Sequence, residues 1–151
     1  MSQSLSRLWT HLIFSTKDRF SFLNELKLRS DMHAYLAKVL RSHDCETLIV
    51  NGTSDHMHAL FDLSRKHSIA TIVKEIKRTS SAWIKEVSSS CRKFHWQNGY
   101  GAFSVSQSHL DRVYRYIERQ EQHHRRVTFQ DEFRSLLKKY EIEYDERYVW
   151  D

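Results

Sequence analysis

The sequence predicts an α+β protein built on a ferredoxin-like split β-α-β sheet with helices on one face, plus a tyrosine-bearing helix and a C-terminal helix. Three observations favour this fold. Strands and helices are expected in the order βαββαβ, two of the helices carry continuous apolar stripes, and one strand alternates between apolar and polar residues. The 151 residues are the size of one domain, so we expect a single domain over residues 1–151.

The first half of the chain begins with a strand and a helix. Residues 8–15 are short and rich in aromatic and aliphatic side chains, which is typical of a strand. Apolar residues three and four apart predict a helix over about residues 24–42. Residues 46–50 are expected to form the second strand. Asn51-Gly52 then predicts a tight turn, because both residues tolerate positive φ.

The third predicted strand, residues 56–63, alternates in character along its length. Successive side chains of a strand point to opposite faces, so His56 and His58 share one face, with Leu60 and Asp62 beyond them. The opposite, apolar face is expected to pack against helices. It consists of Met57, Ala59, Phe61 and Leu63.

The second half adds three helices and one short strand. A strong apolar stripe predicts a helix over about residues 68–87, and residues 103–106 read as a strand. A third helix is expected from residue 108 to about residue 124, with Leu110, Val113, Tyr114 and Ile117 on its apolar side. A last helix is expected over about residues 129–140.

The composition favours a soluble protein with a polyanionic partner. The net charge is +5, from 24 Lys and Arg against 19 Asp and Glu. No apolar run approaches the roughly 20 residues that span a membrane, and the N-terminus does not look like a signal peptide, so we expect a cytoplasmic protein without membrane contact. Cys45 and Cys91 form no CxxC pattern and are expected to be ordinary reduced thiols.

His56 and His58 are the strongest candidates for metal ligands. Their Cα atoms are about 6.5 Å apart if they lie on one strand, so their imidazoles can converge on one divalent ion. The alternative is a pair of exposed histidines on a strand. The well-defined apolar face on the other side of the strand makes the metal site a serious hypothesis.

Tyr116 and Gln120 form the second candidate feature. They are four residues apart on the third predicted helix and share a face, and Tyr116 lies off the apolar stripe. Tyr116 is therefore available for chemistry, and Gln120 could offer an oxygen to a metal. A surface tyrosine beside a solvated glutamine is the alternative. His123 and His124 either touch this site or form a solvated helix end, which is the commoner arrangement.

Basic and aromatic residues suggest where a nucleic acid could bind. A charged outer helix face, and an aromatic loop packed on the core, are the structural alternatives. The aromatic candidates for stacking on unpaired bases are Phe94, Trp96 and Tyr100. The main candidates for phosphate contacts are Lys17, Arg19, Lys74, Lys77 and Arg78, with Lys85, Arg125 and Arg126 as further ones.

These residues resemble the single-tyrosine HUH transposases of small bacterial insertion sequences, within the REP-associated tyrosine transposase-like superfamily. The two histidines flank a hydrophobic residue in His56-Met57-His58, after Gly52-Thr53-Ser54-Asp55, and Tyr116 is followed by Gln120. The resemblance spans nearly the whole chain. Further similar segments are Phe14-Ser15-Thr16-Lys17, residues 96–106 and residues 143–148.

The resemblance implies a metal-dependent enzyme that cleaves and rejoins single-stranded DNA at element ends. Mg²⁺ or Mn²⁺ would be held by His56, His58 and Gln120. Tyr116 would be the catalytic nucleophile and form a 5′-phosphotyrosine link with a free 3′-OH. The DNA partner would carry hairpins near its ends, and the protein would be a homodimer in which the tyrosine helix of one subunit completes the metal site of the other.

Two other functions fit the same residues. A host-adopted relative that cuts repetitive hairpins would use the same catalytic side chains, so the sequence does not separate it from a transposase. A non-catalytic module that binds single-stranded nucleic acid would need neither a metal nor Tyr116. Such a module would be expected to carry stacking aromatics on its sheet, whereas the polar face of the third strand carries histidines.

Overall fold

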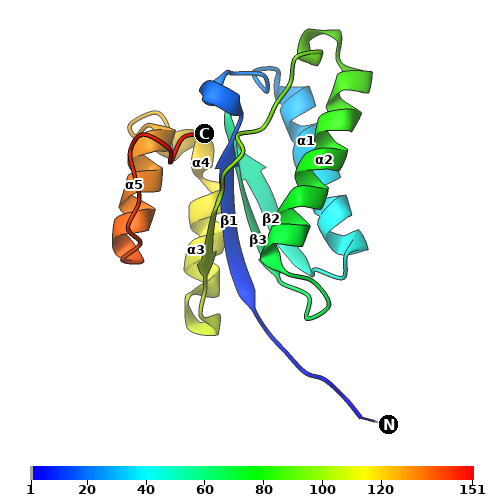
Figure 1. Cartoon of the computed structure of the whole chain (residues 1–151), viewed down its shortest axis with the longest axis vertical. Helices are drawn as coiled ribbons and strands as arrows, with labels where there is room; N and C mark the ends of the chain where they lie inside the picture. Colours follow the sequence, from blue (N-terminus) through cyan, green and yellow to red (C-terminus); the bar gives the residue numbers. More distant parts are fainter. Residues whose placement is uncertain (1) are drawn as a thin grey trace.

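A computed structural model describes residues 2–151 and contains one four-stranded sheet (Figure 1). All neighbouring strands pair antiparallel in the order β2-β3-β1-β4. β3 lies between β1 and β2, which run parallel to each other, and this arrangement confirms the predicted split β-α-β sheet. The strands are β1 (Trp9–Ser15), β2 (Thr47–Gly52), β3 (His56–Asp62) and β4 (Gly101–Ser104).

The helices cover both faces of this sheet. In Figure 1, α1 and α2 lie side by side on one side of the strands, and α3 and α5 lie on the other. Over the described residues no helix is both long enough and apolar enough to cross a bilayer. The helices are α1 (Leu26–Ser42), α2 (Ile69–Val87), α3 (Leu110–Glu118), α4 (Gln120–His123) and α5 (Phe129–Lys139). Short 3-10 turns occur at Lys17–Arg19, Ser89–Cys91 and Gln107–His109.

The main apolar core lies between the sheet and the α1–α2 layer. Met57, Ala59 and Phe61 of β3 are fully buried there, as their alternation with polar residues predicts. The aromatic loop before β4 joins the same core, because Phe94 and Trp96 are buried and the Trp96 indole N–H donates to Ser80 Oγ at 2.9 Å. Phe94 and Trp96 therefore pack on the core and do not present their rings to solvent.

Two smaller apolar clusters attach the remaining helices to the opposite face. α3 packs Ile117 against Trp9 and Leu60. α5 packs Phe133 against Ile13, and Phe103 of β4 completes that cluster. The polar side chains of β1 and β3 lie between these two clusters and are covered without belonging to either of them.

The turn prediction at Asn51-Gly52 is wrong. β2 continues through both residues, Asn51 pairs with His58, and the loop between β2 and β3 is residues 53–55. Gly52 has no positive φ. A Cβ at this position would collide with the His56 carbonyl oxygen, so glycine is required here for close backbone approach.

The helix predicted over residues 108–124 is interrupted. Arg119 leaves the helical conformation, with φ −98° and ψ 22°, and separates α3 from α4. The Asn51 side-chain amide donates to the carbonyls of Ile117 and Glu118 at 2.9 and 3.1 Å. These carbonyls lie at the end of α3, where partners within the helix are missing, so the Asn51 amide satisfies the broken helix end.

Candidate active site

His56 and His58 lie on the polar face of β3 beneath α3, α4 and α5. Both imidazoles are completely buried, with 0% exposure. Their ring centroids are 5.3 Å apart. The prediction that the two histidines share a face is therefore correct, and the face is enclosed by protein.

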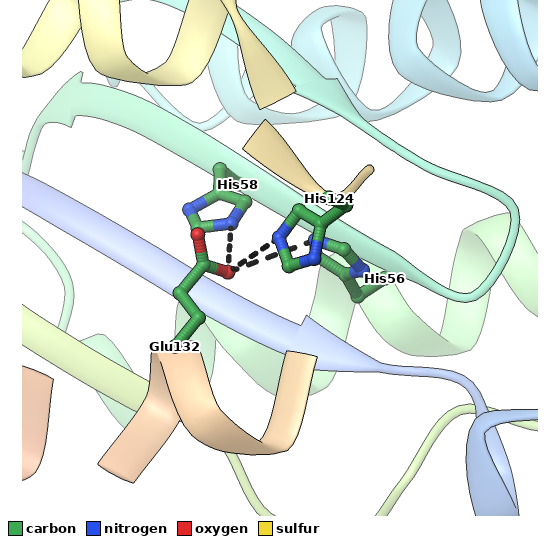
Figure 2. A group of neighbouring side chains, drawn as sticks. All are labelled: His56, His58, His124 and Glu132. Carbon is green, nitrogen blue, oxygen red and sulfur yellow. Dashed lines mark hydrogen bonds and ion pairs between the residues drawn. The ribbon is translucent and has the colours of Figure 1, made fainter. Parts of the chain in front are cut away.

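A glutamate on α5 reaches the centre of this histidine cluster (Figure 2). Glu132 Oε1 lies 3.0 Å from the Nε2 atoms of both His58 and His124, and 3.7 Å from His56 Nε2. One potential ligand atom from each of these four residues lies within 4.8 Å of the others. Three imidazoles and one carboxylate at this spacing have the donor chemistry of a divalent metal site.

Tyr116 and Gln120 converge on the same carboxylate. The Tyr116 hydroxyl, from the last turns of α3, donates a hydrogen bond to Glu132 Oε2. The Gln120 amide N–H₂ lies 3.3 Å from that oxygen, and Gln120 Oε1 lies 3.2 Å from His56 Nε2. The structure therefore brings together all four predicted catalytic and metal residues within one chain.

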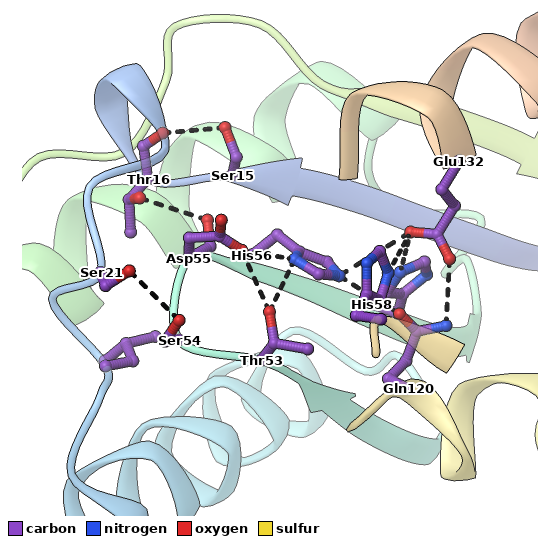
Figure 3. A network of polar contacts seen from close by, with 12 residues as sticks. Ser15, Thr16, Ser21, Thr53, Ser54, Asp55, His56, His58, Gln120 and Glu132 are labelled. Atoms are coloured by element: carbon purple, nitrogen blue, oxygen red, sulfur yellow. Dashed lines mark hydrogen bonds and ion pairs between the residues drawn. The ribbon is translucent and has the colours of Figure 1, made fainter. Parts of the chain in front are cut away.

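The far sides of the two histidine rings also have hydrogen-bonding partners, and Figure 3 shows those of His56. Asp55 Oδ1 and Thr53 Oγ1 lie 2.7 and 2.8 Å from His56 Nδ1. His11 Nε2 lies 2.7 Å from His58 Nδ1. When Asp55 accepts the Nδ1 proton of a neutral His56, the Nε2 lone pair points toward Gln120 Oε1. Two acceptors then face each other, and a shared cation would satisfy both.

Burial and charge set the protonation of the site. Burial lowers the pKa of His58 to about 4 and that of His11 to about 3, so both rings are neutral at pH 7. Burial raises the pKa of Glu132, but hydrogen bonds from His124 and His58 outweigh it and leave the pKa well below its usual range. Burial and then the Glu132 charge raise the pKa of Tyr116, so its phenol stays protonated until a proton acceptor is engaged.

A cavity of about 370 Å³ opens beside Tyr116. It lies between α3 and α5, and its lining includes His11, Tyr116 and Glu132 together with the cationic Lys139. The nucleophile candidate and the central carboxylate therefore both reach an open space that a phosphate group could enter.

Comparison with known proteins decides the family. The family model described as "Transposase IS200 like" matches residues 4–120, which include both histidines, Tyr116 and Gln120. The chain belongs to the IS200-like transposase family. A search of curated proteins found no match.

Two of the solved structures that share this fold carry transposase descriptions. One, from Deinococcus radiodurans R1 and described only provisionally as a transposase, has a TM-score of 0.61 at 22% identity, covering 80% of this chain and 98% of that one. The other, a REP-associated tyrosine transposase bound to a REP hairpin, has a TM-score of 0.52 at 16% identity, covering 80% of this chain and 70% of that one. At these identities the likeness establishes the fold that the family membership implies.

The five main basic candidates for phosphate contacts are not gathered at the tyrosine of this transposase, whereas the further candidates Arg125 and Arg126 line a groove together with Tyr116. Lys74 and Arg78 lie on α2, across the sheet from Tyr116. The Lys77 ammonium donates to three backbone carbonyls, those of residues 97, 98 and 99, at 2.7, 3.2 and 2.7 Å. Lys17 and Arg19 lie in the turn after β1. A phosphate contact by Lys77 would require the loss of those three bonds.

Four residues of the transposase site were missed or undervalued by sequence reasoning. One of them is His123, which was expected at a solvated helix end but whose Nε2 lies 3.3 Å from Glu132 Oε2. Glu132 occupies a position of α5 that lies between Phe129 and Phe133 on the helix face turned toward the core, so a glutamate in an apolar stripe was the available signal. His11 shares the polar face of β1 with Ile13. His124 is only 10% exposed and contacts Glu132, so the solvated-end interpretation is wrong for this residue.

Proposed function

We propose that this family member cleaves and rejoins single-stranded DNA through a covalent 5′-phosphotyrosine at Tyr116. The observation that carries the proposal is the convergence of Tyr116, Gln120 and the β3 histidines on one buried carboxylate beside an open cavity. A tyrosine placed only for packing would not need this set of titratable partners.

The nucleophile needs a proton acceptor, and Glu132 already accepts the hydrogen bond of the Tyr116 hydroxyl. The lowered pKa of Glu132 and the raised pKa of Tyr116 make this proton transfer uphill in the resting site, so the proton is transferred only as the new bond to phosphorus forms. In the proposed reaction the Tyr116 oxygen attacks the phosphorus, the bond to the 3′ oxygen breaks, and the phenol proton passes to Glu132. The same proton can return to the departing 3′ oxygen, which leaves a free 3′-OH. Rejoining is the reverse step, in which a 3′-OH attacks the phosphotyrosine and releases Tyr116. No net hydrolysis takes place, so the phosphodiester energy is conserved.

A divalent cation fits the donor set, and we propose that His56, His58 and Gln120 hold it. When bound, the cation would polarise and orient the phosphate. Asp55 and His11 would fix the rings of His56 and His58 so that each Nε2 faces the site. Among Mg²⁺ and Mn²⁺, imidazole-rich ligands favour Mn²⁺. Because His124 and Glu132 lie within ligand distance of the same point, we propose them as further or exchanging ligands.

The homodimer implied by the family resemblance remains a prediction. Here Tyr116 and Gln120 already lie over the histidines of their own chain. A second subunit is therefore not required to complete this constellation.

The proposal is tested by incubating the protein with labelled single-stranded DNA that carries element-end hairpins, with Mn²⁺, Mg²⁺ or EDTA. We expect a covalent protein–DNA adduct on denaturing gels with either metal, its loss in EDTA, and its loss in Tyr116→Phe. Tyr114→Phe is the matched control, because Tyr114 packs in the α3 cluster and takes no part in the Glu132 network.

Two outcomes would contradict the proposal. DNA binding without an adduct under any metal would favour a non-catalytic binding module. An adduct that persists in Tyr116→Phe would place the nucleophile elsewhere.

A further inference from the structure

A row of arginines runs along the side of α3 that carries Tyr116. Arg112, Arg115 and Arg119 are three and four residues apart, so they share one side of the helix, and all three are exposed. Tyr116 lies four residues after Arg112 and therefore belongs to the same side. The nucleophile candidate thus lies within a strip of positive charge.

This strip forms one wall of a groove of about 900 Å³. Arg125 and Arg126, which follow α4, contribute two further cations, and Asp111 is the one acidic side chain in the lining. Tyr116 and His123 supply the aromatic rings of this lining, which contains no Phe or Trp among the described residues. The groove therefore offers charge and hydrogen-bond donors but little surface on which bases could stack.

The guanidinium groups of these five arginines are unpaired in the part of the chain that the structure describes. Among residues 2–151, none of their guanidinium groups forms a salt bridge or a hydrogen bond. By contrast, Arg7, Arg78, Arg134 and Arg147 each pair with a carboxylate. Holding five unpaired like charges along one groove costs electrostatic free energy unless a polyanion compensates it.

The groove continues into the cavity beside Glu132. The two hollows share Arg112, Tyr116, His123 and Val127 in their linings. A strand whose phosphate reaches Tyr116 through the cavity can therefore continue along the arginines without leaving the protein surface. The basic surface of α2 has no such continuity, because it lies on the other side of the sheet.

We propose that this arginine groove, formed by Arg112, Arg115, Arg119, Arg125 and Arg126, binds the sugar-phosphate backbone of the DNA strand that flanks the cleaved phosphate. The inference rests on the proposed function, because it takes Tyr116 as the nucleophile. Guanidinium groups match phosphate geometry with paired donors. Because cations dominate the lining and it contains no Phe or Trp, we expect the groove to hold the backbone with little dependence on base sequence.

The test compares two variants that lose the same charge on opposite sides of the sheet. The groove variant is R112Q/R115Q/R119Q, and the matched control on α2 is K74Q/R78Q/K85Q. Glutamine keeps the helix propensity, and all six positions are exposed. Binding of labelled single-stranded DNA is measured by fluorescence anisotropy in EDTA between about 50 and 200 mM salt. Thermal melts verify that both variants fold.

We expect the groove variant to bind about tenfold or more weakly and to reduce the slope of log K against log salt by about 2, at about 0.7 per lost phosphate contact. The loss should be equal for unrelated sequences. The α2 control should keep the wild-type slope. Equal losses in both variants, or a loss only in the α2 control, would overturn the proposal.

The same experiment separates this inference from the proposed function. Binding in EDTA does not require catalysis, so a selective loss in the groove variant supports the groove even if wild type forms no adduct. If wild type forms the adduct and the groove variant binds with an unchanged slope, the proposed function stands and the groove assignment fails.

Discussion

The two faces of β3 show how differently packing and chemistry are encoded. On one face, Met57 and Phe61 pack into a core that α1 and α2 complete, and the alternation within the strand predicts their burial. On the other face, His56 and His58 are equally buried, but the partners of their Nε2 atoms come from α4 and α5. Gln120 is 64 residues from His56, and Glu132 is 74 residues from His58. The packing face needs only apolar neighbours, whereas the chemical face needs particular atoms at particular distances.

The largest effects are expected when one residue is replaced on each face of β3. These replacements test whether one face serves mainly stability and the other mainly catalysis. Phe61→Ala should destabilise the protein by about 3–5 kcal/mol, because it empties a fully buried site in the main core. His58→Gln should be less destabilising, because the glutamine keeps a polar group near Glu132, but it should lower the rate of adduct formation at least about 100-fold. Urea unfolding and single-turnover assays measure the two effects.

Those outcomes would be reversed if the histidine face were structural. A His58→Gln protein that unfolds as readily as Phe61→Ala, yet retains its adduct rate per folded molecule, would contradict the assignment of this face to chemistry.

Acid should weaken the histidine face before it affects the apolar core. His11 and His58 stay neutral in the folded protein to about pH 3 and 4, while in the unfolded chain they protonate near 6.5. The unfolded state therefore binds more protons, and stability falls as pH drops below about 6.5. Between pH 7 and 5 we expect a loss on the order of 2 kcal/mol for each histidine that stays neutral.

Chemical denaturation of the protein in EDTA over this pH range measures the loss. Glu132 also has a lowered pKa, but its contribution is lost only below its usual value of 4.5, outside the measured window. Burial also lowers the pKa of His33 on α1 to about 4, so three histidines contribute to this loss. His11→Gln should make the loss of stability between pH 7 and 5 smaller by removing one of the three. An unchanged pH profile in that variant would show that His11 is not kept neutral by the fold.

The smallest expected effect on stability comes from Asn51. Asn51→Ala removes the amide that satisfies the end of α3 and should cost about 1 kcal/mol. Because the same end of α3 carries Tyr116, we expect the adduct rate to fall by more than this destabilisation alone accounts for. Asn51→Asp is a matched variant that keeps the size but loses the amide donor. If both variants keep the wild-type rate, Asn51 serves stability alone.

The sequence was sufficient to predict the sheet and the α1–α2 layer, and it singled out His56, His58, Tyr116 and Gln120, which the structure brings together. Periodicity predicts these elements because each apolar stripe or alternation reflects a local contact with the core. Their placement in one site rested on the family resemblance, because no local pattern predicts which helix covers which part of a sheet.

The errors have physical causes that no local pattern reveals. Asn51-Gly52 has the composition of a tight turn, but both residues make tertiary contacts within β2. The Asn51 amide donates to the carbonyl of Ile117 on α3, and Gly52 packs closely against the His56 carbonyl oxygen. Residues 108–124 contain no proline or glycine, so the sequence carries no signal that predicts the helix break at Arg119. Glu132 escaped notice because its partners lie on strands and helices that are remote in sequence.

The β2–β3 hairpin has a mechanical consequence. The side chain of Asn51 on β2 donates a hydrogen bond to the end of α3, the helix that carries Tyr116. β2 also pairs with β3, which carries His56 and His58. Tyr116 and the two histidines therefore belong to one hydrogen-bonded unit formed by α3, β2 and β3. A bending of the sheet or a shift of the outer helices would move them together and leave their separation unchanged. Glu132 on α5, and Gln120 and His124 beyond the break at Arg119, lie outside this unit, so their distances to the β3 histidines can change.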